Sequence, residues 1–414
     1  MPSRNADTEP EAAGGIGASE QGRRYLLLPI FLVVAVDVLG MTIILPLLPF
    51  YAERLGASPA MVGALVSTFA FCTLLAGPFL GRWSDRIGRR PVLLVSQAGT
   101  LIGFLILANA HALWVVFLAR IIDGTTAGNL TIAQAYISDV TKAEDRARSF
   151  AVIGIAFGLG FLVGPAISGF LSQFGYQVPV YAAAALSLTS ILGSYFLLPR
   201  REVVHERNAA DPGPGGKRLA LFEWGAYRKY FEEPDMARLL AQWLCFAFSF
   251  TTLISGFALF CERQFAWNGH AFGPKEVGYV MAYSGFLSII IQGGMVGRMV
   301  KWMGEKNVVR IGFASSAVGY AMLGLSHTVG QLLAVNTISS VGGGGLRPAL
   351  TSLITQKADR REQGVVIGLT QSLMSIALIT APLIGTALIQ EHLLVLWACW
   401  AGLFAAVGIL LGLN

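Results

Sequence analysis

The sequence predicts an all-α polytopic membrane protein, with twelve transmembrane helices arranged as two pseudo-symmetric six-helix bundles. The chain has 414 residues, of which 54% are hydrophobic and only 13% are charged, and its mean hydropathy is +0.62. An average soluble domain carries about 25% charged residues. This composition excludes an ordinary soluble protein, and a repeated pattern of loops indicates the two bundles.

Twelve apolar stretches are long enough to cross a bilayer, because a span needs about 20 mostly apolar residues for a hydrocarbon core about 30 Å thick. The first stretch is too long for a signal peptide and lacks a small-residue cleavage site, so we expect it to remain as a span. The 48 glycines support a packed bundle, since small residues let helices approach closely in lipid. In chain order, the predicted spans are residues 25–50, 60–81, 91–109, 112–138, 148–171, 177–198, 238–261, 275–297, 308–326, 330–354, 364–389 and 391–413.

Around these spans the chain divides into four predicted parts. One stretch of the linker, "KRLALFEWGAYRKYF", mixes basic with apolar and aromatic residues, which suits a helix lying on the inner leaflet. An ordinary solvated linker is the alternative. The parts are a disordered cytoplasmic N-terminus (1–22), an N-terminal six-helix bundle (23–199), a cytoplasmic linker with this candidate interfacial helix (200–236) and a C-terminal six-helix bundle (237–414).

The basic residues predict the orientation. With the N-terminus in the cytoplasm and twelve alternating spans, 25 of the 30 Lys and Arg residues fall in cytoplasmic segments. Three fall outside (Arg54, Arg263 and Lys275) and two lie within spans (Arg120 and Arg347). This distribution satisfies the positive-inside rule. We therefore expect a multi-pass protein of the plasma (inner) membrane with both termini cytoplasmic, whose net charge of +6 reflects topology rather than nucleic-acid binding.

The two predicted halves repeat each other at a nearly constant offset. Three pairs of segments align, at offsets of 215, 216 and 214 residues, so the chain resembles one six-helix unit that has been duplicated. Duplicated helical bundles with a site between the halves are the architecture of secondary transporters. The pairs are "SPAMVG" (58–63) with "GPKEVG" (273–278), "GRWSDRIGRR" (81–90) with "GRMVKWMGEK" (297–306), and "VTKAEDRARSFAVIG" (140–154) with "ITQKADRREQGVVIG" (354–368).

Four further matches identify the chain as similar to the major facilitator superfamily, within it the proton-driven drug antiporters typified by tetracycline efflux pumps. The resemblance covers nearly the whole chain from Tyr25 onward, and its segments occur in the family's order. It implies the major facilitator fold. The matches are "GRWSDRIGRRP" (81–91) for the loop between helices 2 and 3, "RIIDG" (120–124) for helix 4, "GFLVGPAISG" (160–169) for the helix 5 antiporter motif, with Ser168 in place of a glycine, and "DVLGMTIILPLLP" (37–49) for helix 1.

The resemblance implies a secondary active transporter, specifically a proton-coupled antiporter that exports drug-like amphipathic or organic-ion compounds by alternating access. Two alternatives stay open. One is a proton symporter or facilitator for a metabolite or organic anion, and the other is a non-transporting membrane sensor or scaffold. The sequence has no Walker motif for ATP binding. We expect no enzyme activity, no cofactor other than protons as the coupling ion, no metal site, and a monomer whose partners are a small-molecule substrate and the lipid bilayer.

Charges inside the membrane are expensive and therefore mark candidate functional sites. At about 1.5 Å per residue, Asp37 on helix 1 and Arg120 on helix 4 both lie ~18 Å from the inner face. Burial favours a protonated carboxyl and a nearby cation favours a carboxylate, so a changing Asp37–Arg120 contact would load or release a proton. Asp123, three residues after Arg120, is a second candidate for proton coupling. The alternative is a fixed Asp37–Arg120 or Asp123–Arg120 pair that only stabilises the bundle.

The helix 2–3 loop is a candidate conformational latch. The resemblance implies that Asp85 sits near the positive N-terminus of a helix from the other half, for which we expect the eleventh predicted span (364–389). The helix dipole stabilises a carboxylate there. The remaining members of this candidate latch are Gly81, Arg86, Gly88, Arg89 and Arg90, with Arg86, Arg89 and Arg90 bridging to neighbouring loops. The alternative is that the arginines only set the topology.

The helix 5 motif contributes Gly160, Gly164, Pro165 and Gly169. These residues would remove side chains and kink the helix, which permits close packing against a helix of the second half and could suppress leak. A flexible kink alone is the alternative.

Polar side chains within the spans are candidate substrate contacts, although hydrogen bonding between helices is an equal alternative for each. Arg347 on helix 10 could contact an anionic substrate, or its side chain could snorkel to the inner face. Tetracycline pumps also carry acidic residues on helices 3 and 9, where this chain has Gly103 and Ala314, so tetracycline–metal recognition is not expected. The candidates are Asn129, Gln134, Gln242, Gln292, Asn336, Arg347 and Gln371.

Overall fold

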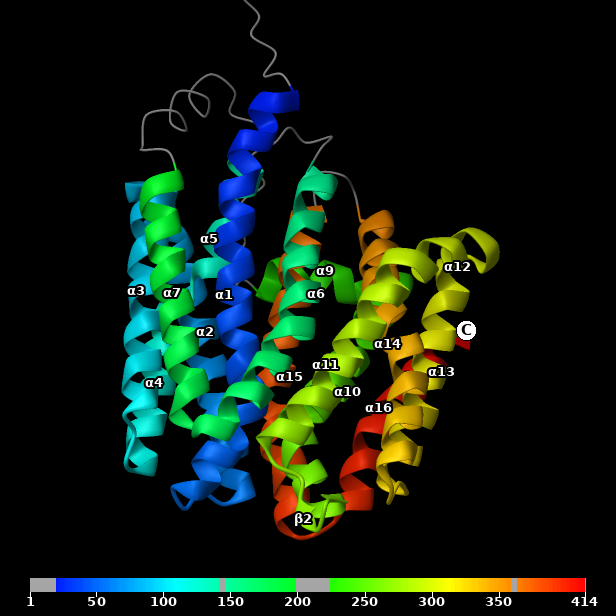
Figure 1. The fold of residues 1–414 in the computed structure, drawn as a ribbon. Helices are drawn as coiled ribbons and strands as arrows, with labels where there is room; N and C mark the ends of the chain where they lie inside the picture. The colour runs from blue at the N-terminus through cyan, green and yellow to red at the C-terminus, as the bar shows by residue number, and fades with distance from the viewer. Residues whose placement is uncertain (1–19, 141–145, 199–223, 359–362, 414) are drawn as a thin grey trace, which may run out of the picture.

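The computed structural model describes residues 20–140, 146–198, 224–358 and 363–413, and most of the predicted N-terminal tail and most of the predicted linker lie outside these ranges. Within them the chain is helical, apart from a hairpin of two short antiparallel strands, β1 (Ala266–Trp267) and β2 (His270–Ala271). Figure 1 shows the helices running side by side along one common direction.

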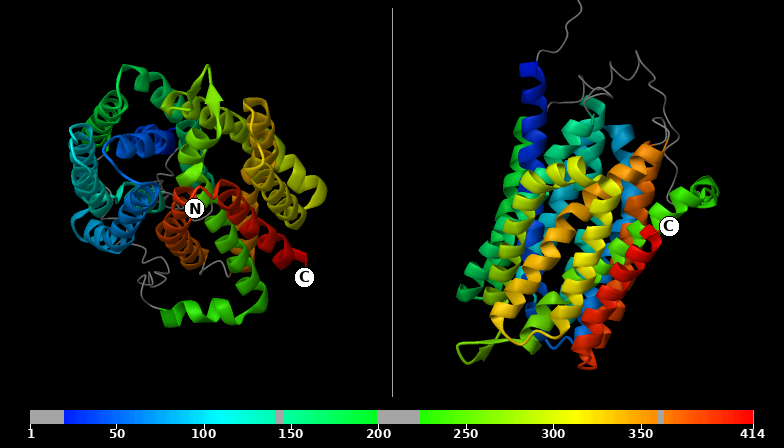
Figure 2. Two further views of the ribbon diagram at one scale, coloured as in Figure 1. Left: turned by 90° about the horizontal axis from the view of Figure 1, so that it is seen from below. Right: turned by 90° about the vertical axis from the view of Figure 1, so that its right-hand side faces the viewer.

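The first group of helices packs α1 against α6 and α7, α3 against α4 and α7, and α2 against α4. It occupies one side of the molecule, coloured blue to green in Figures 1 and 2. Its elements are α1 (Glu20–Arg54), α2 (Pro59–Ile87), α3 (Arg89–Ala108), α4 (Leu113–Thr126), α5 (Asn129–Val140), α6 (Arg146–Leu171), the 3₁₀ turn η2 (Ser172–Phe174) and α7 (Gln177–Leu197).

The second group packs α13 against α14 and α16, and α10 against α15 and α16. The short helix α9 runs across the bundle rather than along it (Figure 2) and buries Tyr230 in the second group's core. The elements are α9 (Trp224–Glu232), α10 (Pro234–Gln264), α11 (Pro274–Ile290), the π-helical turn η3 (Ile291–Met295), α12 (Val296–Met303), α13 (Glu305–Gly324), α14 (Val329–Lys357), α15 (Gln363–Gln390) and α16 (Leu394–Leu413).

Nine of the helices in the described ranges are long and apolar enough to cross a membrane. The other three predicted spans fall on α4 with α5, on α13 and on α14. The predicted span 112–138 is wrong as one continuous helix, because the chain leaves the helical path at Ala127 and Gly128. The Ser96 hydroxyl on α3 bridges this break, donating to the carbonyl of Thr126 and accepting from the backbone N–H of Gly128 at 2.8 Å. These bonds replace those that the broken helix loses.

The repeated segments occupy matching places in the two groups. Pro59 begins α2 and Pro274 begins α11, where a missing backbone N–H costs nothing. Gly88 (φ 100°) joins α2 to α3, and Gly304 (φ 79°) joins α12 to α13. Both positions need a backbone conformation that side chains with a Cβ rarely adopt. The duplication read from the sequence is therefore present in the backbone.

We call "outer end" the end of the molecule that carries the turn at residues 55–58 and the β1–β2 hairpin, the lower end in Figure 1, and "inner end" the opposite one. Near the outer end the two groups pack tightly along α2–α15 and α6–α11. A Cβ added to Gly63 would overlap Thr386 of α15, and one added to Gly278 would lie 2.5 Å from the carbonyl oxygen of Pro165 on α6. The absence of side chains at these glycines permits the contact.

Toward the inner end the same helices present glycines without this constraint. A Cβ added to Gly77 or Gly81 of α2, to Gly154 of α6 or to Gly368 of α15 would meet no described atom within 4 Å. The described contacts between the groups are therefore concentrated from the outer end to the middle of the molecule.

Glycines on α11 and η3 provide a matched test of this packing. In Gly285→Ala, the new Cβ would lie 2.5 Å from the carbonyl oxygen of Phe161 on α6. We expect the melting temperature of the purified protein to fall, because overpacking typically costs about 1–3 kcal/mol. Gly293→Ala is the control, since no described atom lies within 4 Å of its added Cβ. Equal melting temperatures for the two variants would contradict the packing assignment.

Candidate functional site

A buried ion pair lies within the first group of helices. The guanidinium of Arg120 donates to the carboxylate of Asp123 at 2.6 Å, and the two side chains are only 9% and 8% exposed. The pair lies along one face of α4, because residues three apart on a helix are neighbours. The Arg120 guanidinium also lies over the ring of Phe69 on α2, 4.9 Å from its centroid. The pairing of Arg120 with Asp123 is one of the two fixed pairs that the sequence left open.

Asp37 lies on α1 beside this pair. The side chains of Gln97 (α3), Asn129 (α5) and Ser190 (α7) surround its carboxyl group, and Asp123 is close enough to repel it electrostatically. Gln97 donates to the Ser190 hydroxyl at 2.7 Å. The structure therefore gathers six residues into one polar cluster, which we call the interior cluster: Asp37, Gln97, Arg120, Asp123, Asn129 and Ser190.

The interior cluster has unfilled hydrogen-bonding capacity of both signs. Oδ2 of Asp37 is a buried acceptor, and Nε of Arg120 is a buried donor, and neither has a hydrogen-bond partner among the described residues. Oδ1 of Asn129 and Oε1 of Gln97 are also buried acceptors without a hydrogen-bond partner among the described residues. Buried polar groups are nearly always bonded, so this arrangement is costly in one fixed conformation.

Sequence reasoning missed two members of the interior cluster, Gln97 and Ser190. The signal was present, since Gln97 is an amide inside the otherwise apolar span 91–109. Ser190 gave no signal, because α7 also buries Ser187 and Ser194. Only the packing of α7 against α1 and α3 singles it out.

Gly103 explains why no acid stands on α3 near this cluster. A Cβ added there would lie 2.9 Å from Cβ of Asp123. A carboxylate at this position would collide with Asp123, so the helix packing itself excludes it. The other aligned position, Ala314 on α13, is exposed.

The helix 2–3 loop forms a basic network within the first group. Arg89 pairs with the carboxylates of Asp85 and, at 2.8 Å, Asp139 at the end of α5. Arg90 donates to the backbone carbonyls of Ser194 and Tyr195 on α7. We expected Asp85 to contact the N-terminus of α15, which is the eleventh predicted span. Residues 359–362, directly before this N-terminus, lie outside the described ranges. Arg86 is exposed, and Gly81 and Gly88 lie at the end of α2 as described above.

The expectation for the helix 5 motif needs correction for two of its four residues. Added Cβ atoms on Gly160 and Gly164 would overlap Val38 and Thr42 of α1, in the same group of helices. Thr42 also donates to the carbonyl of Gly160 at 2.9 Å. Pro165 and Gly169 face α11 of the second group instead. The glycines lie on two faces of α6 because 160 and 164 are one turn apart, whereas 169 is not in phase with them.

The predicted polar substrate contacts are dispersed. Gln242 is buried on α10 and donates to the carbonyl of Gly408 on α16 at 3.0 Å, which is the interhelical hydrogen bond left open as the alternative. Asn336 on α14 donates to Ser284 on α11 at 2.6 Å. Gln292 is exposed on the π turn η3, and Arg347 is exposed on α14. The remaining two, Gln134 on α5 and Gln371 on α15, are half-buried.

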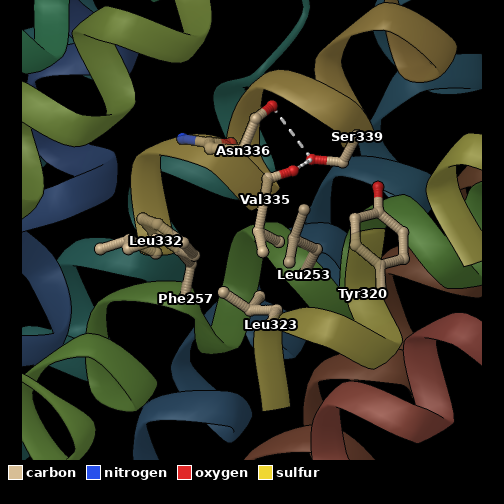
Figure 3. A pocket seen from close by; sticks show the side chains of 8 residues that line it. All are labelled: Leu253, Phe257, Tyr320, Leu323, Leu332, Val335, Asn336 and Ser339. Atoms are coloured by element: carbon tan, nitrogen blue, oxygen red, sulfur yellow. Dashed lines mark hydrogen bonds between the residues drawn. The ribbon is translucent and has the colours of Figure 1, made fainter. Parts of the chain in front are cut away.

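A small cavity lies inside the second group, between α10, α13 and α14 (Figure 3). It has room for about one water molecule, far below the roughly 300–1,000 Å³ typical of ligand pockets. Its walls are mostly apolar, and the Ser339 hydroxyl at its edge is already bonded to the carbonyls of Val335 and Asn336. The lining residues are Leu253, Phe257, Tyr320, Leu323, Leu332, Val335, Asn336 and Ser339.

A cluster of three charged side chains joins the two groups at the outer end. Arg263 of α10 contacts Glu53 of α1 at 2.5 Å and its neighbour Glu262 at 3.1 Å. All three are partly buried, with side chains 23%, 17% and 31% exposed. Sequence reasoning placed Arg263 outside the membrane but missed its partners, because Glu53 and Arg263 are 210 residues apart. We call this the outer ion-pair cluster.

Comparison with known proteins agrees with the fold. The model of the Major Facilitator Superfamily matches residues 30–325 and 272–414. The tetracycline resistance protein, class B, of Escherichia coli is 31% identical over 371 residues, which cover 89% of each chain. Multidrug resistance protein 2 of Bacillus subtilis (strain 168) is 25% identical over 361 residues, covering 87% of this chain and 88% of that protein.

Solved structures show the same arrangement of helices. The crystal structure of the human organic anion transporter MFSD10 (TETRAN) matches with a TM-score of 0.70 at 22% sequence identity. The match covers 94% of this chain and 99% of that chain. At this level of identity the likeness concerns the fold alone.

The outer ion-pair cluster predicts how firmly the outer end is closed. In Arg263→Gln, Glu53 would stay partly buried without its cation. We expect Cys at position 386 (Thr386→Cys, 0% exposed between α15 and α2) to react with a membrane-impermeant maleimide about five- to tenfold faster than in the parent. The expected factor follows from the roughly 1.5–3 kcal/mol of a hydrogen bond to a charged group, reduced by solvent screening.

This experiment uses a background in which Cys72, Cys245, Cys261 and Cys399 are replaced by Ala. Glu262→Gln is the control, because it keeps the contact between Arg263 and Glu53. An unchanged labelling rate in Arg263→Gln would show that this ion pair does not hold the outer end closed.

Proposed function

The chain belongs to the major facilitator superfamily, a family of transporters and not of enzymes, and on this premise we propose that it is a proton-coupled antiporter. It would export drug-like amphipathic or organic-ion compounds by alternating access between the two six-helix halves. The named relatives support the substrate class, since they are a tetracycline resistance protein and a multidrug resistance protein. The protein is a multi-pass membrane protein, and we propose the plasma (inner) membrane, a monomer, and cytoplasmic N- and C-termini.

The observation that carries the proton-coupled mechanism is the pair of unfilled groups in the interior cluster. Asp37 offers a buried acceptor and Arg120 a buried donor, both without a partner in this conformation. A conformation that brought these two atoms together would satisfy both. Asp37 would then pair as a carboxylate, and it would carry a proton when the two atoms separate.

Charge counting supports the same assignment. With Asp37 protonated, the interior cluster contains one carboxylate and one guanidinium and is neutral. With Asp37 ionised, two carboxylates share Arg120, and the cluster has a charge of −1. Electrostatic interactions are strong where water is scarce, so the protonation state of Asp37 biases the helix arrangement around it. Asp123 contributes by holding Arg120 in place.

Packing at the outer end supports alternating access. The outer ion-pair cluster and the glycine contacts along α2–α15 and α6–α11 close this end. The glycines at the inner end of the same helices would supply equivalent contacts when the halves rock, because small residues allow close approach. Rigid-body rotation about an interface is an established form of switching.

The helix 2–3 loop would act as the latch of the inner end. Asp85 would move toward the N-terminus of α15, where the dipole favours a carboxylate by about 0.3–1 kcal/mol. Arg89 and Arg90 anchor this loop to α5 and α7. The latch would therefore move with the first half as one body.

We predict that Asp37→Asn abolishes coupling. In proteoliposomes containing a pH-sensitive dye, a panel of lipophilic cations and organic anions should evoke proton flux through the wild type. In Asp37→Asn, flux should fall to the level of protein-free liposomes, because the amide cannot release a proton. Asp235→Asn, which is exposed at the start of α10, is the control and should resemble the wild type.

Three outcomes would contradict this assignment. Labelled substrate flux without proton movement, unaffected by Asp37→Asn, would indicate a facilitator. Uptake driven by an inward proton gradient would indicate a symporter. Bound substrate without any flux would indicate a membrane sensor or scaffold.

We predict that Asp85→Asn slows substrate flux about two- to fivefold, because losing about 0.3–1 kcal/mol at the helix N-terminus would destabilise the state closed at the inner end. The measurement is initial export rate at equal protein content in proteoliposomes. Arg82→Gln is the control, since Arg82 is exposed in the same loop. An unchanged rate in Asp85→Asn would show that the helix 2–3 loop is not a latch and that its arginines only set the membrane topology.

A further inference from the structure

Arg347 is a second cation inside the predicted spans, and its surroundings differ from those of Arg120. Arg120 is buried and paired, whereas Arg347 is exposed and has no ion-pair or hydrogen-bond partner for its guanidinium in the described part of the chain. It lies ten residues before the end of α14, a distance of ~15 Å along the helix. An unpaired charge at such a depth needs either water or a ligand.

The guanidinium of Arg347 is partly shielded from solvent by the surrounding protein, although its side chain as a whole is exposed. A side chain that snorkelled to the membrane surface would have protein on one side only. This combination of features favours a space between helices over the lipid-facing surface.

The π turn η3 packs beside the segment of α14 that carries Arg347. Gly344 packs against Ile291 of η3, and Gly345 packs against Val296 of α12, so the segment of α14 that carries Arg347 runs beside this turn. Gln292 on η3 is exposed, and Gly343 on α14 has no described atom within 4 Å of an added Cβ. Single π turns inside helices occur frequently at functional sites. Two independent features, an unpaired cation and a π turn, therefore meet at one place.

Two acidic side chains in the described part of the second group's inner end, Glu305 and Asp235, already have partners. Glu305 at the start of α13 accepts hydrogen bonds from Ser352 and Gln356. Asp235 pairs with Lys357 at 2.5 Å. The positive charge of Arg347 is therefore not neutralised by these acids, and the exposed Arg298 and Lys301 on α12 add to the positive potential of this region.

We propose that Arg347, beside the π turn η3, binds the anionic group of a transported compound. A guanidinium forms two parallel hydrogen bonds with a carboxylate, sulfonate or phosphate, so it selects for anionic groups of this shape. This inference rests on the proposed transport function and specifies its substrate class as amphipathic organic anions. An anionic lipid headgroup offers the same chemistry, and the experiment separates the two sources.

The test measures equilibrium binding of fluorescein, an amphipathic organic anion, by fluorescence anisotropy to the full chain in nanodiscs of phosphatidylcholine. We expect Arg347→Gln to weaken binding about tenfold or more, because a charge-assisted hydrogen bond pair is lost. Arg347→Lys should retain part of the affinity, since it keeps the charge but loses the planar geometry. Arg82→Gln, which removes an exposed cation of α2 in the first group, is the matched control and should bind as the wild type does.

Binding of the cation rhodamine 6G checks that each variant is folded, and it should not change in Arg347→Gln. Equal fluorescein affinity in wild type and Arg347→Gln, or no fluorescein binding by the wild type, would overturn the proposal. Loss of fluorescein binding when phosphatidylglycerol is included in the nanodiscs would also overturn it and identify a lipid headgroup as the ligand. Binding that depends on Arg347 without proton flux in proteoliposomes would refute the coupled mechanism while leaving this site intact.

Discussion

The cost of an unpaired charge at membrane depth governs the interior of this protein. Arg120 and Asp123 meet this cost together, through a 2.6 Å contact on one face of α4. Because that pair is complete, Asp37 has no ionic partner in the described part of the first group. Arg347 has no ionic partner in the described part of the second group. The surroundings of the two side chains differ, since Asp37 lies among amides and hydroxyls, whereas Arg347 is exposed.

Glycine packing determines where the two halves can meet. Gly63 and Gly278 are equivalent positions in the repeated segments, and both lie against the opposite half. The same kind of contact, between a glycine near the start of one helix and a helix of the other half, therefore occurs twice. It joins α2 to α15 and α11 to α6. The second pair of glycines, Gly81 and Gly297, is also equivalent, and neither has a described atom within 4 Å of an added Cβ. The duplication thus places both contacting and open positions symmetrically.

Most of the fold was predictable from the sequence, because the need for about 20 apolar residues per span leaves a clear pattern. The helical character, the fold family and the repeat all followed from it. The break in helix 4 was not predictable, because Gly128 alone is common within membrane helices. It needs Ser96 of another helix to bond the freed backbone groups. Local sequence carries no record of such a partner.

The candidate site was predictable in part for the same reason. Charged residues inside spans are rare enough to be recognised individually, which singled out Asp37, Arg120, Asp123 and Arg347. The sequence did not predict which of these residues pair. Asp37 and Arg120 have the same predicted depth, but Arg120 pairs with Asp123, the nearer carboxylate on α4. The direction of Gly160 and Gly164 toward α1 and the ion pair of Glu53 with Arg263 depend on helix rotation and on contacts distant in sequence.

The break between α4 and α5 divides one predicted span into two segments that carry different parts of the interior cluster. Arg120 and Asp123 lie on the α4 side of the break, and Asn129 lies on the α5 side, with Ser96 joining the two sides by hydrogen bonds rather than by continuous helix. A tilt of α5 relative to α4 would change the distance from Asn129 to Asp37 without separating Arg120 from Asp123. The chain thus has a junction at the level of its interior cluster, with the ion pair on one side and the amide of Asn129 on the other.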